Sequence, residues 1–335
     1  MKTLFLYIVN EGTAPRLAGI SAVDWLIRGA GEIPYRVIER EEDISLPPTE
    51  YFAVLTPKTP LVTAQHLLDL LEEIGKRGYK GIEIGEGMLV ESAAYREGFR
   101  PKRRASDPCF VPCRGAEDRA SAERTLYRKI AQECVQNGAI IPDPDSVRID
   151  ALSFVGQGAV IEPFTFVYKS QVEEGAQVGS FSQIENSVIG AGATVRHSVV
   201  CDSRIGAGTT VGPFAYIRGG SQIGENCRIG DFVEVKKSVF GAGVKAAHLA
   251  YVGDAAVGER TNVGCGTVFA NYDGREKHKT HVGKGVFIGA NSNLVAPLSI
   301  GDGAYIAAAT TVTEDVPSGS FVIGRTRAAA KERKK

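Results

Sequence analysis

The amino-acid sequence predicts a mainly β fold: a parallel β-helix of hexapeptide repeats, preceded by a small α/β domain and a helical arm. In the C-terminal part, apolar residues recur at every sixth position, and glycine often follows them directly. In the N-terminal part, apolar runs of strand length alternate with a helical pattern, which is typical of an α/β domain. We expect the α/β domain at 1–114, a helical linker at 115–138, the β-helix at 139–325 and a basic tail at 326–335.

The bulk composition limits the classes of protein to consider. The chain has 335 residues, of which 43% are apolar, and its 39 Lys and Arg are balanced by 39 Asp and Glu. A net charge of zero argues against a general binder of nucleic acids or anionic membranes. No apolar run reaches the ~20 residues that cross a membrane, and six scattered cysteines do not suggest a disulfide framework. We therefore expect a cytoplasmic protein with reduced thiols.

The first 114 residues read as strands and a helix. The stretches "TLFLYIV" (3–9), "YFAVLT" (51–56) and "GIEIG" (81–85) predict strands. Between them, "HLLDLLEEIGKRG" (66–78) predicts a helix that buries Leu67, Leu68, Leu70 and Leu71.

The residues 116–137 predict the helical arm. Leu126, Ile130 and Cys134 fall on one stripe of a helix, and most of the other residues are good helix formers. Gly138 follows as a stop signal.

The six-residue period defines the β-helix. It places apolar residues in two series: Val199, Ile205, Val211, Ile217, Ile223, Ile229 and Val235, then Val282, Ile288, Leu294, Ile300, Ile306 and Val312. A looser version begins near Val155 and Ile161. Each hexapeptide gives one short strand and one turn, so the aliphatic side chains stack into an interior column. Glycine allows the corners their unusual backbone angles.

The period breaks once, within "FANYDGREKHKTHV" (269–282). Val257, Val263 and Phe269 keep the spacing, but position 275 is Arg, and the period resumes only at Val282. Seven additional and mostly charged residues predict a loop that leaves the coil. Loops on rigid scaffolds commonly carry binding and catalytic residues.

His248 is a candidate general base. It lies in "AAHLAY", between small residues, where a coil corner would expose it. An imidazole titrates near neutral pH, so it suits the removal of a proton from an attacking amine. A lone histidine is more often structural, and the catalytic assignment therefore depends on the surrounding motif.

Four strings place this histidine in a larger pattern. "DFVEVKKS", "KAAHLAYVGDA", "TNVGCGTVFANYDGREKHKT" and "SNLVAPLSIGDGAYIAA" occur in this order. The segment from about Asp118 to Pro317 resembles the C-terminal half of the bifunctional N-acetylglucosamine-1-phosphate uridyltransferase/glucosamine-1-phosphate N-acetyltransferase (GlmU) family. The resemblance implies a left-handed β-helix and a homotrimer with sites between subunits. It also implies acetyl transfer from acetyl-CoA to glucosamine-1-phosphate without a metal, in the synthesis of the cell-wall precursor UDP-N-acetylglucosamine.

The resemblance also implies the roles of individual residues. The catalytic residues are His248 as general base and Asn271, which would support the oxyanion together with backbone N–H groups. The residues implied for the acceptor are Arg218, Lys236 and Lys277 around the phosphate, and Glu234, Tyr251 and Asn262 around the sugar. The residues implied for acetyl-CoA are Cys265, Tyr272, Ala290, Ala308 and Arg325.

Departures from the family pattern leave alternatives open. The family often has Ala at 265, Ser at 290, Gly at 309 and Pro at 219, where this chain has Cys265, Ala290, Ala309 and Gly219. Another amino sugar or another acyl group is therefore a second hypothesis. A zinc site formed by His248, His278 and His281 is a less favoured alternative, because the resemblance accounts for His248 without metal.

The N-terminal domain departs further from the family. The glycine-rich phosphate loop with which the family opens is replaced by "YIVNEGTAPRL". In "PKTPLV", Lys58 stands where the family has a metal-binding Asp, and a cation repels Mg²⁺. "AEDR" (116–119) replaces a second metal-binding motif. We expect a truncated, degenerate uridyltransferase half whose activity is lost; a non-catalytic regulatory or scaffold paralogue is the third hypothesis.

Overall fold

The computed structural model describes residues 2–10, 12, 14–325 and 328. The chain divides into two compact units, residues 1–129 and 130–335, and the division falls inside helix α4 (Ala116–Gln136). The predicted helical arm is confirmed as this helix, while the domain boundaries stay predictions. The predicted basic tail, apart from Ala328, lies outside the described residues. Within the described part, no helix is both long and apolar enough to cross a bilayer.

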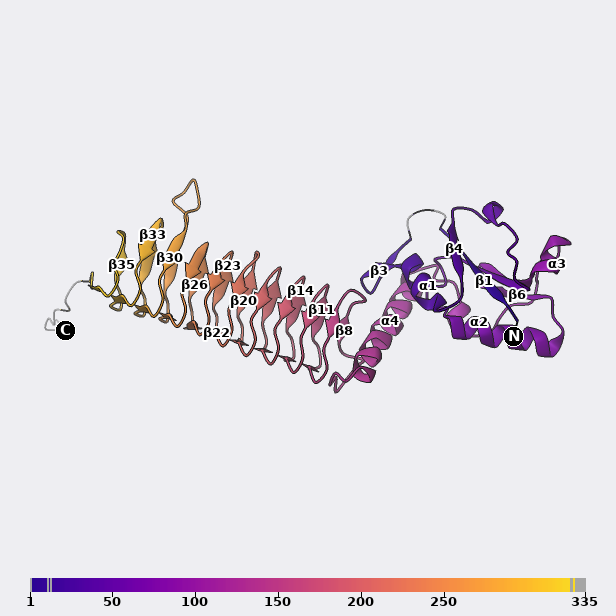
Figure 1. The fold of residues 1–335 in the computed structure, drawn as a ribbon, viewed down its shortest axis with the longest axis horizontal. Helices are drawn as coiled ribbons and strands as arrows, with labels where there is room; N and C mark the ends of the chain where they lie inside the picture. Colours follow the sequence, from indigo (N-terminus) through magenta and orange to yellow (C-terminus); the bar gives the residue numbers. More distant parts are fainter. Residues whose placement is uncertain (1, 11, 13, 326–327, 329–335) are drawn as a thin grey trace, which may run out of the picture. The chain divides into compact units, whose positions relative to one another are not determined.

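The first unit is built on a five-stranded sheet (Figure 1). Its order is β4 (Tyr35–Ile38), β1 (Leu4–Val9), β5 (Tyr51–Leu55), β7 (Gly87–Glu91), β6 (Gly81–Ile84). Strand β1 runs parallel to β4 and β5, and β7 runs antiparallel to β5 and β6. A short antiparallel pair, β2 (Arg16–Leu17) and β3 (Ile20–Ser21), precedes the first helix. The three strands predicted here are confirmed as β1, β5 and β6.

Short helices complete the first unit. They are α1 (Ala22–Ala30), α2 (Ala64–Arg77), α3 (Ser92–Arg96) and the 3₁₀ turns η1 (Glu41–Asp43) and η2 (Pro108–Phe110). Helix α2 ends at Gly78, whose left-handed φ of 66° a glycine adopts without strain. Leu67, Leu70 and Leu71 are buried as predicted. The prediction for Leu68 is wrong: it is 44% exposed, because the helical period turns it towards solvent.

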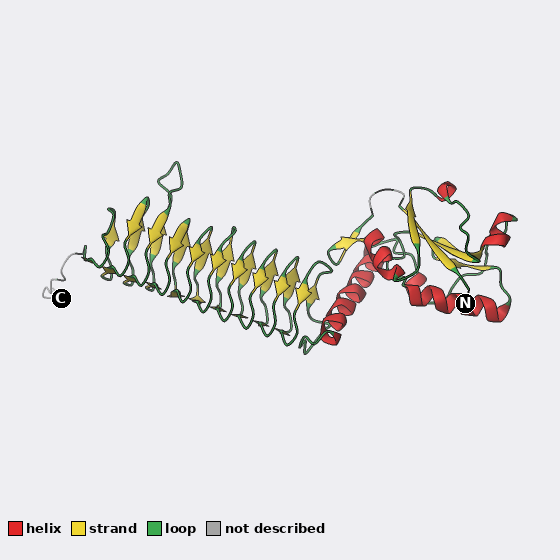
Figure 2. Cartoon of the chain, in the orientation of Figure 1, coloured by secondary structure: helices red, strands yellow, loops and turns green. Residues whose placement is uncertain are grey.

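The second unit is a parallel β-helix, in which three sheets of short strands stack coil upon coil (Figures 1 and 2). Sheet I contains β10 (Val160–Ile161), β13 (Gln177–Val178), β16 (Thr194–Val195), β19 (Thr210–Val211), β22 (Arg228–Asp231), β25 (Lys245–His248), β28 (Asn262–Val263), β31 (Phe287–Ile288), β34 (Tyr305–Ile306) and β36 (Phe321–Val322).

Sheet II contains β8 (Arg148–Ile149), β11 (Phe166–Tyr168), β14 (Gln183–Glu185), β17 (Val199–Cys201), β20 (Tyr216–Arg218), β23 (Glu234–Lys236), β26 (Tyr251–Gly253), β29 (Val268–Ala270), β32 (Asn293–Val295) and β35 (Thr311–Val312). Sheet III contains β9 (Phe154–Val155), β12 (Gln171–Val172), β15 (Val188–Ile189), β18 (Arg204–Ile205), β21 (Gln222–Ile223), β24 (Val239–Phe240), β27 (Ala255–Val257), β30 (Thr280–Val282) and β33 (Leu298–Ile300). This architecture confirms the predicted fold class and is consistent with the left-handed form.

The interior column of the β-helix follows the predicted period with one shift. Ile205, Ile217 and Val235 are fully buried, and burying one such side chain stabilises the fold by about 1.5–3 kcal/mol. The inward residue of β17 is Val200 rather than the predicted Val199, because two successive turns there contain five residues instead of six. Coils consequently vary in length: the register partners Arg218 and Lys236 lie 18 positions apart, whereas Asp231 and His248 lie 17 positions apart.

The predicted break in the period is a loop between β29 and β30, which leaves the stack of strands (Figure 2). The loop is a small hairpin: Tyr272 bridges to Lys277, and the His278 N–H donates to the Asn271 carbonyl at 2.8 Å. At its tip, Asp273 accepts hydrogen bonds from the N–H groups of Arg275 and Glu276 and contacts His278 Nε2 at 2.7 Å. The N–H of Glu276 and the His278 side chain hold the pKa of Asp273 well below its usual range. The inserted residues thus have a defined turn.

Candidate functional site

Two predicted phosphate ligands lie side by side on sheet II. Arg218 ends β20, Lys236 ends β23, and their Cα atoms are register partners. Ile217 and Val235, the residues before them, point into the interior and are fully buried. Because side chains alternate along a strand, Arg218 and Lys236 point to the same outer face.

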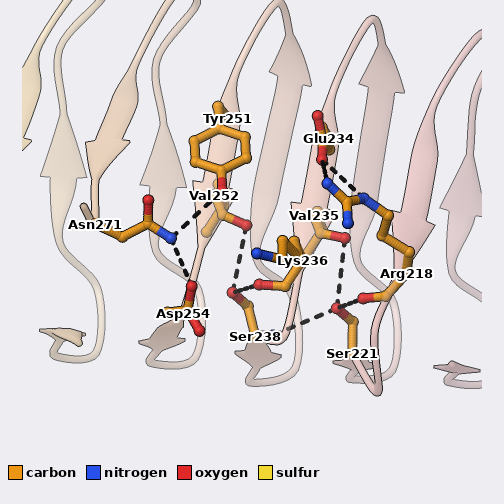
Figure 3. A network of polar contacts seen from close by, with 10 residues as sticks. All are labelled: Arg218, Ser221, Glu234, Val235, Lys236, Ser238, Tyr251, Val252, Asp254 and Asn271. Carbon is orange, nitrogen blue, oxygen red and sulfur yellow. Dashed lines mark hydrogen bonds and ion pairs between the residues drawn. The ribbon is translucent and has the colours of Figure 1, made fainter. Parts of the chain in front are cut away.

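Arg218 is held by Glu234. Its Nε and Nη2 both donate to Glu234 Oε1, at 2.9 and 2.6 Å, and this hydrogen-bonded carboxylate raises the pKa of the guanidinium (Figure 3). The two side chains are about one-third exposed. Glu234, expected to orient the sugar, therefore contacts Arg218 in this structure. The contact fixes the guanidinium on the outer face, and Arg218 Nη1 makes no hydrogen bond to Glu234.

Buried serines hold the backbone below these cations. Ser221 Oγ donates to the Arg218 carbonyl at 2.7 Å, and Ser238 Oγ donates to the Lys236 carbonyl at 2.9 Å (Figure 3). The Ser238 N–H in turn donates to Ser221 Oγ at 3.3 Å. Each hydroxyl adds a second hydrogen bond to a carbonyl that also accepts a backbone N–H, and Ser221 Oγ satisfies the Ser238 N–H.

The inserted loop brings Lys277 to Lys236. The neighbouring Lys236 ammonium lowers the pKa of Lys277. Lys236 is only 9% exposed, whereas Lys277 is exposed. Two ammonium groups at close range repel each other, so this position favours an anion that lies between them. With Arg218 one coil away, the arrangement suits a phosphate.

Asn271, at the start of the loop, connects to Tyr251 and Asp254. Its Nδ2 donates to Asp254 Oδ2 at 2.6 Å and to the Tyr251 hydroxyl at 3.4 Å (Figure 3). Gly253 makes room for this contact, because a Cβ at position 253 would lie 2.7 Å from Asn271 Nδ2. Both amide hydrogens of Asn271 are thus directed at acceptors. This geometry does not fit the expected role of Asn271 as an oxyanion donor.

The candidate base His248 has a carboxylate partner. It ends β25 on sheet I, where its Cα pairs with that of Asp231, and its Nδ1 lies 2.6 Å from Asp231 Oδ1. The imidazole contact lowers the pKa of Asp231. The His248 side chain is 53% exposed. A carboxylate that holds Nδ1–H leaves Nε2 as the nitrogen that can take a proton from a substrate.

The residues expected at the acyl donor lie along the same corner as His248. The Gly266 N–H donates to the His248 carbonyl at 3.4 Å, and the Asn291 N–H donates to the Cys265 carbonyl at 2.7 Å. Two further hydrogen bonds continue along this corner. The Ala309 N–H donates to the Ala290 carbonyl at 2.7 Å, and Arg325 Nη1 donates to the Ala308 carbonyl at 2.9 Å. This acyl-donor corner, defined as Cys265, Ala290, Ala308 and Arg325, therefore begins one coil beyond His248.

The structure does not gather all predicted residues into one group. Asn262 starts β28 on sheet I, and the Tyr272 hydroxyl donates to the Gly274 carbonyl within the loop. His248 lies in the corner before β26, and the cations lie at the far ends of the sheet II strands, so the two groups lie at opposite ends of this sheet. No group of three His, Cys, Asp or Glu suited to a metal occurs among the described residues.

Sequence reasoning missed two carboxylates, Asp231 and Asp254. Each lies 17 positions before its partner, His248 and Asn271 respectively. Seventeen residues is one coil of the β-helix at this place, so residues at that spacing stack on each other. The sequence contains this 17-residue separation, but the separation indicates a contact only once the length of a coil is known.

The chain is similar to proteins of known family. Residues 202–237 match the model for the bacterial transferase hexapeptide (six repeats). The chain is 46% identical over 229 residues to the bifunctional protein GlmU of a Geobacillus species, covering 67% of this chain and 50% of that protein. It is 41% identical over 273 residues to the same protein of Clostridium acetobutylicum, covering 78% and 58%. The chain therefore spans about half the length of the curated relatives it matches.

Two solved structures align with part of the chain. A UDP-N-acetylglucosamine acyltransferase from Arabidopsis aligns with a TM-score of 0.36 and 15% identity, covering 56% of this chain and 70% of that one. The enzyme of the same name from Campylobacter jejuni aligns with a TM-score of 0.30 and 19% identity, covering 53% and 67%.

Proposed function

The chain is homologous to the GlmU proteins over about half of their length, and from this premise we propose that it is an acetyl-CoA-dependent N-acetyltransferase acting on glucosamine-1-phosphate. The observation that carries the proposal is the cation cluster on sheet II. The neighbouring Lys236 ammonium lowers the pKa of Lys277, and Arg218 lies beside Lys236 as its register partner. Such a cluster favours a ligand with about two negative charges, which a sugar phosphate supplies.

The proposed chemistry uses the His248–Asp231 pair. His248 Nε2 removes a proton from the acceptor amine, while Asp231 holds the opposite ring nitrogen and stabilises the resulting imidazolium. The amine nitrogen attacks the thioester carbonyl, a C–N bond forms, and the C–S bond breaks. The CoA thiolate leaves and takes a proton, which His248 can return. Because the Asn271 amide faces Tyr251 and Asp254, we assign the oxyanion to backbone N–H groups.

Acetyl-CoA is proposed to lie along the acyl-donor corner. Cys265 and Ala308 are exposed there, and Arg325 offers a cation for the phosphates of CoA. Ala290 and Cys265 replace residues common in the family. These replacements are the reason to test longer acyl groups and other amino sugars as the second candidate function.

Alkylation of Cys265 is expected to abolish acetyl transfer, because it places a bulky group in the acyl-donor corner. Among the described cysteines, Cys265 is the exposed one, and burial raises the pKa of the Cys113 and Cys201 thiols, which slows their reaction. The measurement is the rate at which iodoacetamide removes activity, with and without acetyl-CoA. Iodoacetamide should inactivate the Cys265→Ala variant about ten-fold more slowly than it inactivates the wild-type protein, with each rate expressed relative to the activity of that protein before treatment. Equal rates for the two proteins would contradict the placement of the donor.

The proposed enzyme is a homotrimer with sites between subunits. A row of aromatic side chains stacks along the corner that leads to His248: Phe164, Phe181, Phe214 and Phe232 are each more than half exposed. Exposed apolar rows of this kind usually mark protein interfaces. The separation between His248 and the cations within one chain also supports a site that a neighbouring subunit completes.

Uridyltransferase activity is proposed to be lost. Lys58, which replaces the metal-binding Asp of the family, forms an ion pair with Glu86 at 2.6 Å. The Lys58 hydrogen bond holds the pKa of Glu86 below its usual range, so that carboxylate is ionised and already occupied. An ammonium at this position is unsuited to binding Mg²⁺.

The test is an assay of CoA thiol release with a panel of acceptors. Glucosamine-1-phosphate, glucosamine and N-acetylglucosamine-1-phosphate separate the contributions of the amine and the phosphate. Glucosamine-1-phosphate is expected to be the best acceptor, and N-acetylglucosamine-1-phosphate, which has no free amine, should give no release. Faster release with another amino sugar or acyl-CoA would favour the second candidate function. Absence of acetyl-CoA binding by calorimetry would favour a non-catalytic paralogue.

A further inference from the structure

Asp254 lies at the root of the inserted loop and contacts both of its ends. It follows β26 in a coil corner, with a left-handed φ of 51°. Its carboxylate accepts a hydrogen bond from Asn271 Nδ2 at 2.6 Å, and its backbone carbonyl accepts one from the Thr280 N–H at 3.3 Å. Asn271 begins the loop and Thr280 begins β30. A single residue therefore ties the loop to the coil that carries Tyr251.

The carboxylate also decides which way the Asn271 amide faces. An ionised carboxylate only accepts hydrogen bonds, so the NH₂ group of Asn271 must face Asp254. The Tyr251 hydroxyl accepts the second amide hydrogen. The amide oxygen of Asn271 points away from Asp254 (Figure 3). Asn271 consequently offers its surroundings an acceptor and not a donor.

Asp254 also affects the cations of the site. Its negative charge acts on Lys277 in the direction opposite to the Lys236 ammonium. Without a bound anion, Lys236 and Lys277 repel each other, and the loop that carries Lys277 would tend to move away. The two contacts at the root and the charge of Asp254 all oppose this movement.

We propose that Asp254 is a positioning residue, which holds the inserted loop so that Lys277 meets Lys236 across the anion site before the anion binds. In the same contact it presents the Asn271 amide oxygen as a hydrogen-bond acceptor. The identity of the anion rests on the proposed function, whereas the position of the loop does not.

The direction in which one substitution changes the KM for the sugar phosphate distinguishes a positioning role of Asp254 from a purely electrostatic one. Asp254→Asn keeps the size of the side chain and removes its charge. If Asp254 acted only as a nearby negative charge, its removal would favour an anionic substrate and lower the KM for the sugar phosphate. If Asp254 positions the loop, the Asn271 amide loses its fixed orientation and the repulsion between the lysines is no longer opposed. The KM for the sugar phosphate should then rise.

The β-helix offers a matched control in Asp202. This residue occupies the same corner three coils earlier, with a φ of 49°, and its Oδ1 accepts a hydrogen bond from Asn186 Nδ2 at 2.7 Å. Asp202→Asn therefore removes an equivalent carboxylate–amide contact from the same scaffold, away from the proposed site. A merely structural effect should appear equally in both variants.

The first experiment measures steady-state kinetics of the full chain and the two variants. Asp254→Asn is expected to raise the KM for glucosamine-1-phosphate about ten-fold, with the KM for acetyl-CoA nearly unchanged. Asp202→Asn is expected to change the KM of neither substrate. A lowered or unchanged KM for the sugar phosphate in Asp254→Asn, or an equal change in Asp202→Asn, would overturn the proposal.

The second experiment needs no substrate, so it stands even if the proposed reaction fails. Hydrogen exchange is measured by mass spectrometry on peptides that cover 271–280. Asp254→Asn should increase exchange there, since the N–H groups of His278 and Thr280 lose protection, while Asp202→Asn should leave those peptides unchanged. Asn271→Asp places a second carboxylate next to that of Asp254, and the two repel each other. This variant breaks the same contact by changing the residue on the loop, so hydrogen exchange in these peptides should increase as it does in Asp254→Asn. Unchanged exchange in both loop variants would refute the positioning role.

Discussion

Replacing His248 with alanine is expected to lower kcat for acetyl transfer by about 10²–10⁴-fold, with small changes in either KM. His248 is exposed at its corner and its Nδ1 is held by Asp231, so its loss removes the proton acceptor without disturbing the interior of the β-helix. The measurement is CoA thiol release with saturating acetyl-CoA and glucosamine-1-phosphate.

Two further variants make the His248 result specific. Asp231→Asn keeps the imidazole but weakens its orientation, so an intermediate loss of kcat, about ten-fold, is expected. His281→Ala removes an exposed histidine from sheet III, where no role is proposed, and should leave the rate unchanged. Equal rates for wild type and His248→Ala would exclude the proposed base.

Replacing Lys236 with methionine is expected to raise the KM for glucosamine-1-phosphate by about 10–100-fold, the effect of losing one charged hydrogen bond to a phosphate. Lys236 is almost fully buried on sheet II, and methionine keeps most of its apolar stem. The measurement compares glucosamine-1-phosphate with glucosamine, which has no phosphate. The preference for the phosphorylated acceptor should shrink in Lys236→Met.

Lys237 is the natural control for this substitution. It is adjacent in sequence and exposed at the corner after β23, so Lys237→Met changes the same charge without touching the cluster. It should leave the preference for the phosphate intact. A loss of activity in Lys236→Met that is equal for both acceptors would show that Lys236 serves the fold and not the phosphate.

Much of the fold could be predicted because the hexapeptide period reports directly which side chains point inward. The period could not show that β17 turns Val200 inward, since coils of 16 and 17 residues look alike in a list of aliphatic positions. In the N-terminal unit, α1 was not predicted, and Leu68 was placed in the core although its helix turns it outward. The sequence pattern therefore predicts whether a segment is a helix or a strand more reliably than it predicts which of its side chains face the core.

The site was predictable to a lesser degree. The interruption after Phe269 correctly indicated a loop, but its hairpin geometry depends on Asp273 contacts that no periodicity reveals. Both the pairing of His248 with Asp231 and that of Asn271 with Asp254 follow from a coil of 17 residues, and they can be recognised only once that coil length is known.

The identity of the sugar product tests the central proposal most directly. The wild-type protein is incubated with acetyl-CoA and glucosamine-1-phosphate, and the sugar phosphate is analysed by mass spectrometry and NMR. The account predicts one acetyl group on the amine nitrogen, formed in equal amount to the CoA released. Release of CoA without an acetylated sugar, acetylation of a hydroxyl oxygen, or no reaction would contradict it.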